Sequence, residues 1–406
     1  MSSRTMPPDT LYLWYMGDPR APVLVGELNL VMSRRGVSLR YAEDWIKHGF
    51  PLSEDLPLND MEHFPREKDT AAGAVDDARP DRWGERVIRL LDRPSRLSVL
   101  EFLYYAGDDR FGALGVSTSQ TAYQPREIGP LPKLVDVDAV HDVVRRVLAN
   151  EPVEDRQKRL VVPGVTMGGA RPKALFQLGG EEWVLKFAED DRPAEPLIEH
   201  AAMTLAAKAG VVVAETQPIF FKTGVAVAIR RFDRVAGRRL HALSANVALK
   251  AAGVELSYPN LALLLRRRGV ADVNLAQMHE LFRRLVFNIL IDNTDDHEKN
   301  HVILVTEDHQ YALAPAFDVL PIGQSLGYQA LVVGERGAES SIENALTAAA
   351  QYWLTPQAAL AEARRVARVV DGWRAHFAAV GLSDAVLDEL TYHIDSPFLL
   401  KQRQAL

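Results

Sequence analysis

Cysteine is absent from the 406 residues of this chain. The absence excludes a disulfide framework, a zinc site with thiolate ligands, an iron–sulfur cluster and a cysteine nucleophile. No apolar run approaches the roughly 18–20 residues of a membrane-spanning helix. The first ten residues, MSSRTMPPDT, lack the charged and then apolar layout of a signal peptide. The sequence therefore predicts a soluble, cytoplasmic protein with no membrane partner.

The chain also lacks a strong excess of positive charge. Its 47 lysines and arginines are outnumbered by 54 aspartates and glutamates, and the net charge is −7. Nucleic acid would therefore be attracted only by local basic patches. The hydrophobic content of 47% excludes a disordered or collagen-like protein, and the length predicts two or three domains.

The pattern of apolar residues divides the chain into three segments. Apolar residues alternate with others over residues 11–32, as in β-strands, and Gly17-Asp18-Pro19 predicts a hairpin connection between two strands in this range. Residues 173–187 predict a second hairpin, with Gly179-Gly180 at its turn, and helical spacing dominates after about residue 240. We predict an α+β protein with a β-rich segment (1–125), an α/β segment (126–235) and a helical segment (236–406).

A glycine-rich stretch, GVTMGGARPK, runs from Gly164 to Lys173 between two predicted strands. Glycines let backbone N–H groups approach an anion closely, and Arg171 and Lys173 add positive charge. The stretch fits neither a Walker A nor a Rossmann motif, so alone it fits a plain turn or a phosphate loop equally well. Lys186 in the next predicted strand favours the phosphate loop, because kinases carry their phosphate-binding lysine on a strand that follows the glycine-rich loop. The alternative is an ordinary strand lysine whose side chain extends to the solvent.

A polar loop, NTDDHEKN, follows a long apolar helix pattern at residues 293–300. Asp295 and Asn300 have the D-x₄-N spacing of a kinase catalytic loop. A carboxylate there can accept the proton of a substrate hydroxyl, and a neutral oxygen can bind Mg²⁺. Asp318, in the apolar frame AFDVLP, offers a second metal ligand. Each residue alone could be a turn or capping residue, but their order along the chain favours a kinase.

Residues 297–301 also satisfy H-E-x-x-H, the pattern of zinc proteases. That pattern brings its two histidines together only on a helix, whereas this one lies between a turn and a predicted strand. In an extended chain His297 and His301 would be about 13 Å apart, too far to share one zinc ion. A zinc hydrolase is therefore disfavoured.

Five arginines fall within residues 230–239. They could form a basic patch for nucleic acid, but the aspartate among them favours a strand-end linker with Arg–Asp pairs. Arg266-Arg267-Arg268 is a second basic run, for which a solvated helix end is the simplest interpretation.

With these motifs in order, the sequence resembles the HipA family of bacterial serine/threonine kinases, the toxins of HipB–HipA modules. The N-terminal segments similar to the family are GELNLVM, PLSEDLPL, ARPDRWGERVI and GDDRFGALGV, although Arg79 stands where leucine is usual. The similar segments of the kinase part are GGARPKALF, WVLKF, RRFDR, NTDDHEKNHVIL and LAPAFDVLP.

The resemblance implies a bilobal protein-kinase-like fold with an extra β-rich N-terminal subdomain and a mostly helical C-terminal lobe. It implies that Asp295 is the catalytic aspartate and that Asn300 and Asp318 hold Mg²⁺. The residues that it implies for ATP binding are Thr166, Met167, Gly168, Gly169, Ala170, Arg171, Lys173, Lys186, Arg230, Phe232, His297 and Lys299.

The resemblance also implies regulation and partners. In the family, autophosphorylation of a loop serine ejects the loop and switches the kinase off, and Thr166 stands at that position here. Family substrates include aminoacyl-tRNA synthetases, and the family partner is a small helix-turn-helix antitoxin (HipB-like), through which operator DNA would mainly be contacted. Two alternatives remain open: a catalytically weak kinase-fold co-repressor and a small-molecule kinase.

Overall fold

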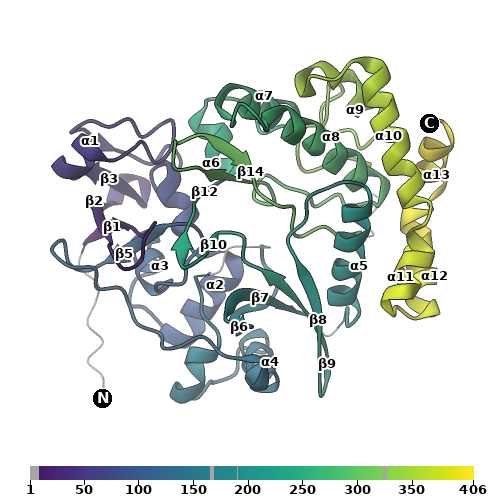
Figure 1. Ribbon diagram of the computed structural model, residues 1–406. Helices are drawn as coiled ribbons and strands as arrows, with labels where there is room; N and C mark the ends of the chain where they lie inside the picture. The colour runs from purple at the N-terminus through teal and green to yellow at the C-terminus, as the bar shows by residue number, and fades with distance from the viewer. Residues whose placement is uncertain (1–8, 165–168, 190, 323–326) are drawn as a thin grey trace. The chain divides into compact units, whose positions relative to one another are not determined.

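The computed structural model describes residues 9–164, 169–189, 191–322 and 327–406 (Figure 1). Its internal contacts group the chain into two compact units. The first unit comprises Met1–Lys186 and Arg231–Leu243, and the second comprises Phe187–Arg230 and Ser244–Leu406. The three segments expected from the sequence remain a prediction.

An antiparallel sheet of five strands, in the order β4-β3-β2-β1-β5, forms the core of the N-terminal part of the first unit. Its strands are β1 (Thr10–Tyr15), β2 (Val23–Val31), β3 (Gly36–Tyr41), β4 (Glu62–His63) and β5 (Leu114–Ser117). The hairpin predicted around Gly17 is confirmed, since β1 pairs with β2. Alternate residues such as Leu11, Leu13 and Val25 are completely buried, so the period-2 pattern of the sequence marks the core face.

Short helices and a second hairpin complete the first unit. The helices are α1 (Glu43–His48), η2 (Gly73–Ala78), α2 (Arg82–Val87), α3 (Val99–Tyr105), α4 (Val137–Leu148), η5 (Asp155–Leu160), the one-turn η1 (Met32–Arg34) and η4 (Leu134–Asp136), and the π-helix η3 (Ile88–Asp92). The strands are β6 (Lys173–Leu178), β7 (Glu181–Phe187), β10 (Arg234–Val235), β11 (Arg238–Arg239) and β12 (His241–Ser244). The predicted turn between β6 and β7 is confirmed, with both Gly179 and Gly180 at positive φ, where glycine carries no steric penalty.

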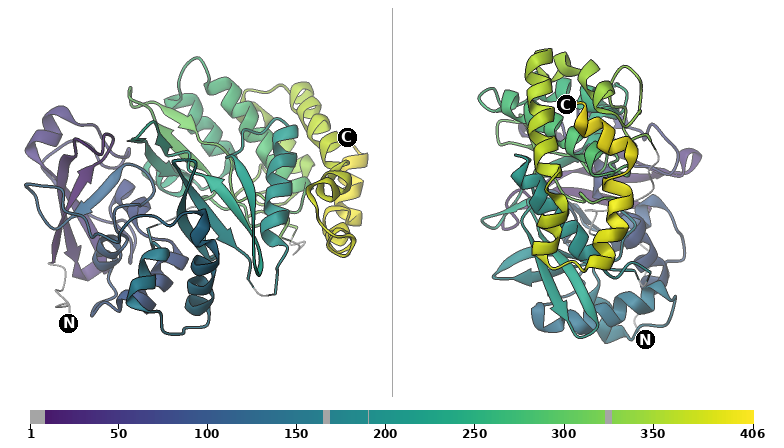
Figure 2. Two further views of the ribbon diagram at one scale, coloured as in Figure 1. Left: turned by 60° about the horizontal axis from the view of Figure 1, so that its bottom comes forward. Right: turned by 90° about the vertical axis from the view of Figure 1, so that its right-hand side faces the viewer.

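The second unit is mostly helical and is built around α8 (Asn274–Leu290), most of whose residues are buried. The other helices are α5 (Glu195–Lys208), α6 (Ala245–Ala251), α7 (Tyr258–Arg268), α9 (Ile342–Thr347), η6 (Ala349–Tyr352), α10 (Pro356–Val370), α11 (Trp373–Val380), α12 (Asp384–Ile394) and α13 (Pro397–Gln404). Helices α10 to α13 lie together, as Figure 2 shows. The strands are β8 (Thr216–Phe221), β9 (Gly224–Arg230), β13 (Val302–Val305) and β14 (Tyr311–Leu313).

Local capping signals in the sequence correspond to real helix ends. Thr355 caps α10, because its hydroxyl oxygen accepts a hydrogen bond from the backbone N–H of Ala358 at 3.2 Å, with Pro356 in the first turn. Among the described residues, no helix is both long and apolar enough to cross a bilayer.

Candidate active site

The 293–300 loop begins where α8 ends. Asp292 turns the chain with a positive φ of 60°, and the backbone N–H of Asn293 donates to the Asn288 carbonyl at 2.9 Å. The Asp295 side chain is exposed, whereas Thr294 and Asp296 on either side of it are buried. The loop therefore presents the Asp295 carboxylate to solvent and anchors its neighbours in the unit.

Asp295 and Asn300 are held together by a tight turn. The Asp295 carbonyl accepts from the backbone N–H of His297 at 2.9 Å and from the Asn300 side-chain amide at 3.3 Å. The backbone N–H of Asn300 donates to the His297 carbonyl at 2.9 Å. The D-x₄-N spacing thus places the two predicted site residues in one hydrogen-bonded turn, with half-buried His297 and exposed Lys299 between them.

Asn300 fits a metal ligand. Its side chain is 4% exposed, and its Oδ1 atom is buried with no hydrogen-bond partner in the described part of the chain. A buried carbonyl oxygen without a partner costs about 1–3 kcal/mol. Carboxylate and amide oxygens are the protein ligands that Mg²⁺ prefers, so a cation would satisfy this atom.

Asp318 has an unusual backbone conformation. It is buried and has a φ of 57°, a region that costs a residue with a side chain about 1–3 kcal/mol and is found most often at functional sites. Its neighbours Phe317 and Val319 line a small cavity together with Asn300. The structure therefore brings the Asp318 segment beside the 293–300 loop.

Asn300 and Asp318 would provide only part of a metal's coordination. No cluster of three or more histidine, aspartate or glutamate side chains that could hold a metal ion occurs among the described residues. Mg²⁺ in a nucleotide site is usually bound by one or two protein carboxylates and otherwise by phosphates and water, so two protein ligands can be enough.

Asp296, which the sequence analysis did not select, anchors the loop. Its carboxylate accepts a short hydrogen bond from the Tyr258 hydroxyl and lies 2.9 Å from Nε2 of His301. Tyr258 in turn accepts from the Asn288 amide at 3.2 Å. These partners lie up to 38 residues from Asp296 in the sequence, so no local pattern predicts them.

The H-E-x-x-H pattern does not form a zinc site. His301 is buried against Asp296 just before β13, and the Nδ1 atom of His297 accepts from the backbone N–H of Lys299 at 3.3 Å. The segment forms a turn that leads into a strand, as predicted, so the geometry on which the zinc motif depends is missing.

Only the end of the glycine-rich stretch can be described. The predicted residues Thr166, Met167 and Gly168 lie outside the described residues. Gly169 has a φ of 63°, Ala170 is exposed and Arg171 is half-buried.

The two lysines of the first hairpin are both buried. Lys173 and Lys186 face each other in the β6–β7 register. The Lys173 ammonium group forms a short ion pair with Asp81 and donates to the Gly169 carbonyl at 2.6 Å, while its own carbonyl accepts from the Trp83 indole at 2.7 Å. Lys173 therefore fixes the end of the glycine-rich stretch through protein partners, a role that the sequence analysis did not foresee.

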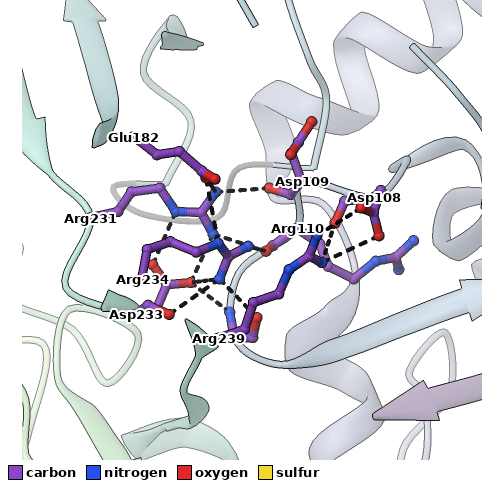
Figure 3. A network of polar contacts seen from close by, with 9 residues as sticks. Asp108, Asp109, Arg110, Glu182, Arg231, Asp233, Arg234 and Arg239 are labelled. Atoms are coloured by element: carbon purple, nitrogen blue, oxygen red, sulfur yellow. Dashed lines mark hydrogen bonds and ion pairs between the residues drawn. The ribbon is translucent and has the colours of Figure 1, made fainter. Parts of the chain in front are cut away.

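The arginine-rich segment forms a buried ion network in the first unit (Figure 3). Asp233 is completely buried and accepts from the guanidinium groups of Arg231 at 2.7 Å and Arg234 at 2.8 Å, and from the backbone N–H of Gly112 at 2.8 Å. Arg231 also binds Glu182 at 3.0 Å. The interpretation as Arg–Asp pairs at a strand end is confirmed for these residues.

The network extends to residues 108–110. Arg231 donates to the carbonyls of Asp109 at 3.1 Å and Arg110 at 2.9 Å, and Arg239 pairs with the Asp108 carboxylate at 2.7 Å. These contacts surround Phe232, which packs edge-on against Phe111. Arg230 and Phe232, two of the residues predicted to bind ATP, lie where the chain passes from the second unit to the first.

We expect Asp233→Ala to lower the free energy of unfolding by about 3–5 kcal/mol, since it removes the completely buried carboxylate that two buried guanidinium groups share. Burial raises the pKa of Asp233, but attraction to Arg231 and Arg234 outweighs it and holds this pKa well below the usual aspartate range. The stabilisation is therefore complete above the pKa of an unfolded aspartate, about 3.9, and is lost as the pH falls further.

Denaturant unfolding at pH 7 and at pH 3 measures this effect. Asp18→Ala is the matched control, because the Asp18–Arg20 pair lies at the surface, where ion pairs contribute little to stability. Equal unfolding midpoints for the two variants would contradict the proposed contribution of the ion network to stability.

Two family models match the sequence. Residues 165–373, about half of the chain, match the HipA-like C-terminal domain, and residues 22–117 match the HipA N-terminal domain. A curated relative is the Sinorhizobium fredii protein Y4dM, whose name assigns it provisionally to the kinases. It is 30% identical over 154 residues, and the match spans 35% of this chain and 37% of that protein's length.

A solved structure of HipA shows the same fold. HipA from the Shewanella oneidensis MR-1 HipA, HipB and operator DNA complex covers 97% of this chain and 99% of its own, with a TM-score of 0.63 and 18% identity. The Helicobacter pylori proinflammatory kinase CtkA covers 59% of this chain and 90% of its own, with a TM-score of 0.39 and 16% identity. The HipA likeness over nearly the whole chain confirms the predicted fold class, an α+β kinase-like fold.

Proposed function

This chain belongs to the HipA family, and on that premise we propose that it is an ATP- and Mg²⁺-dependent protein serine/threonine kinase, the toxin of a toxin–antitoxin module. The observation that carries the proposal is the 293–300 loop. In this loop the Asn300 side-chain amide donates to the backbone carbonyl of Asp295, whose side chain is exposed, while the buried Asn300 Oδ1 atom has no protein partner among the described residues. The strained Asp318 segment lies beside it.

Four of the predicted residues have roles in the proposed reaction. Asp295 accepts a hydrogen bond from the substrate hydroxyl, orients it towards the terminal phosphate and receives its proton. Asn300 and Asp318 would hold Mg²⁺, which neutralises phosphate charge when bound. Lys186 would contact the nucleotide phosphates. Catalysis would then depend on the positioning of the reactants and on charged groups that are in place before the reaction starts.

The partners follow from the same premise. The solved HipA structure is of a complex with HipB and operator DNA, which supports a helix-turn-helix antitoxin as the partner of this chain. We propose a translation component such as an aminoacyl-tRNA synthetase as the phosphorylated protein. The net charge of −7 suits DNA contact made mainly through the antitoxin.

Autophosphorylation at Thr166 tests the proposed activity. Incubation of the purified chain with Mg²⁺ and labelled ATP should place one phosphate on Thr166, and mass spectrometry of the peptides would locate it. Thr166→Ser should retain the modification, because serine keeps the hydroxyl, and Thr166→Ala should lose it. A phosphate mapped to another residue would contradict the regulatory role of Thr166.

A catalytically weak co-repressor is the second candidate. Every predicted catalytic position is filled, which supports the kinase. A chain that neither incorporates phosphate nor binds ATP, yet still strengthens operator binding by an antitoxin, would favour the co-repressor.

A further inference from the structure

A cavity of about 10 Å³ lies within the second unit, next to the 293–300 loop. Apolar walls come from residues such as Phe287 and Phe317, and the polar lining is Arg284, Asn288, Asp296, Asn300 and His301. This volume is about the lower limit for enclosing one water molecule. The cavity is therefore large enough for a single small ligand.

Three polar atoms from the lining have no hydrogen-bond partner within the described residues: Arg284 Nη1, Asn300 Oδ1 and His301 Nδ1. The three side chains are only 3%, 4% and 2% exposed, respectively. The other polar atoms of these side chains are engaged. Arg284 donates to the Glu280 carboxylate and to the Ala314 carbonyl, both at 2.7 Å, while His301 binds Asp296.

The hydrogen-bonding character of the three atoms defines the ligand. Arg284 Nη1 can only donate, and Asn300 Oδ1 can only accept. His301 places Nε2 against a carboxylate, so Nε2 carries the hydrogen and Nδ1 of the neutral ring accepts. The ligand must therefore accept one hydrogen bond and donate two.

We propose that this cavity binds one structural water molecule, which accepts from Arg284 Nη1 and donates to Asn300 Oδ1 and His301 Nδ1. An alkali cation would leave the Arg284 donor without an acceptor, and a halide would face two acceptors and only one donor. Water matches all three atoms and removes three buried unsatisfied groups at once.

The water gives Arg284 a positioning role, an inference that rests on the proposed function. The Asn300 carbonyl oxygen has two lone pairs. One accepts from the water and the other remains for Mg²⁺. The amide is then fixed at both ends, by the Asp295 carbonyl on Nδ2 and by the water on Oδ1. Such outer partners typically change metal affinity 10–100-fold.

The test compares a double variant with a matched control. Glu280→Gln with Arg284→Met removes the buried ion pair as a unit and eliminates the Nη1 donor, while glutamine can still accept from the backbone N–H of Val212. Glu280→Gln alone keeps Arg284 and its donor. Crystal structures of wild type and both variants would show the cavity, and titration with Mg²⁺ at a fixed concentration of an ATP analogue would give the half-saturating Mg²⁺ concentration.

The water should be present in wild type and in Glu280→Gln, and absent from the double variant. The half-saturating Mg²⁺ concentration should rise about tenfold in the double variant and stay within twofold in the control. A wild-type cavity without water density would overturn the site. An unchanged Mg²⁺ requirement in a double variant that has lost the water would overturn the positioning role.

Asn300→Ala separates this inference from the proposed function. If Asn300→Ala does not change the Mg²⁺ requirement, Asn300 is not a metal ligand; the proposed metal site and the positioning role then both fail, although water density would still establish the hydration site. If Asn300→Ala raises the requirement while wild type lacks the water, the metal site stands and the inference fails.

Discussion

Replacing Asp295 with asparagine is expected to lower phosphotransfer about 100- to 10,000-fold. The substitution keeps the size of the side chain and removes the group that accepts the substrate proton, and general base catalysis typically contributes 10²–10⁴-fold. The fold should be unaffected, since the Asp295 side chain is exposed. Incorporation of labelled phosphate and the thermal unfolding midpoint measure the two effects separately.

Glu298→Gln is the matched control for Asp295. It removes one negative charge from the same loop, and its contact with the backbone N–H of Asn246 is made by the main chain and survives the change. Phosphotransfer by this variant should stay within about twofold of wild type. Activity that falls equally in both variants would show that loop charge, rather than a specific base at Asp295, supports the reaction.

Asp318→Gly is expected to weaken Mg²⁺-dependent binding of an ATP analogue at least about tenfold, which corresponds to about 1.4 kcal/mol. The substitution removes the proposed metal-binding carboxylate. It also relieves the backbone, because glycine adopts a φ of 57° without a steric penalty. Nucleotide binding should therefore fall while the unfolding midpoint stays equal or rises. Calorimetric titration with and without Mg²⁺, together with thermal unfolding, measures both quantities.

The opposite directions of these two effects make the Asp318 test selective. A substitution that damaged the fold would lower binding and stability together. Asp318→Asn serves as a second variant, since asparagine also tolerates positive φ and lacks the charge. Unchanged Mg²⁺-dependent affinity in both variants would remove Asp318 from the proposed metal site.

Features that depend on neighbouring residues could be predicted from the sequence. The hairpins at Gly17 and Gly179, the Thr355 cap and the turn that joins Asp295 to Asn300 each arise from a few consecutive residues. Their conformations are set by backbone sterics and local hydrogen bonds, which act wherever the segment lies.

Features that depend on distant partners could not be predicted in this way. The ion pair of Lys173 with Asp81, which lies 92 positions earlier, has no local signal in the sequence, and the phosphate-binding role of Lys173 stays a prediction. In the sequence, Asp296 is one more carboxylate of the loop. In the structure, its contacts with Tyr258 and His301 anchor the loop. The family resemblance supplied the roles of Lys186 and Asp318, which periodicity alone left ambiguous between a binding residue and an ordinary strand or turn residue.

Binding of a non-hydrolysable ATP analogue to the wild-type chain, measured by calorimetry with and without Mg²⁺, is the decisive measurement for the proposed kinase. We expect saturable binding at one site, strengthened at least tenfold by Mg²⁺, because Asn300 and Asp318 act on the nucleotide through the metal. No binding under either condition would contradict a kinase built on the 293–300 loop and would favour the co-repressor.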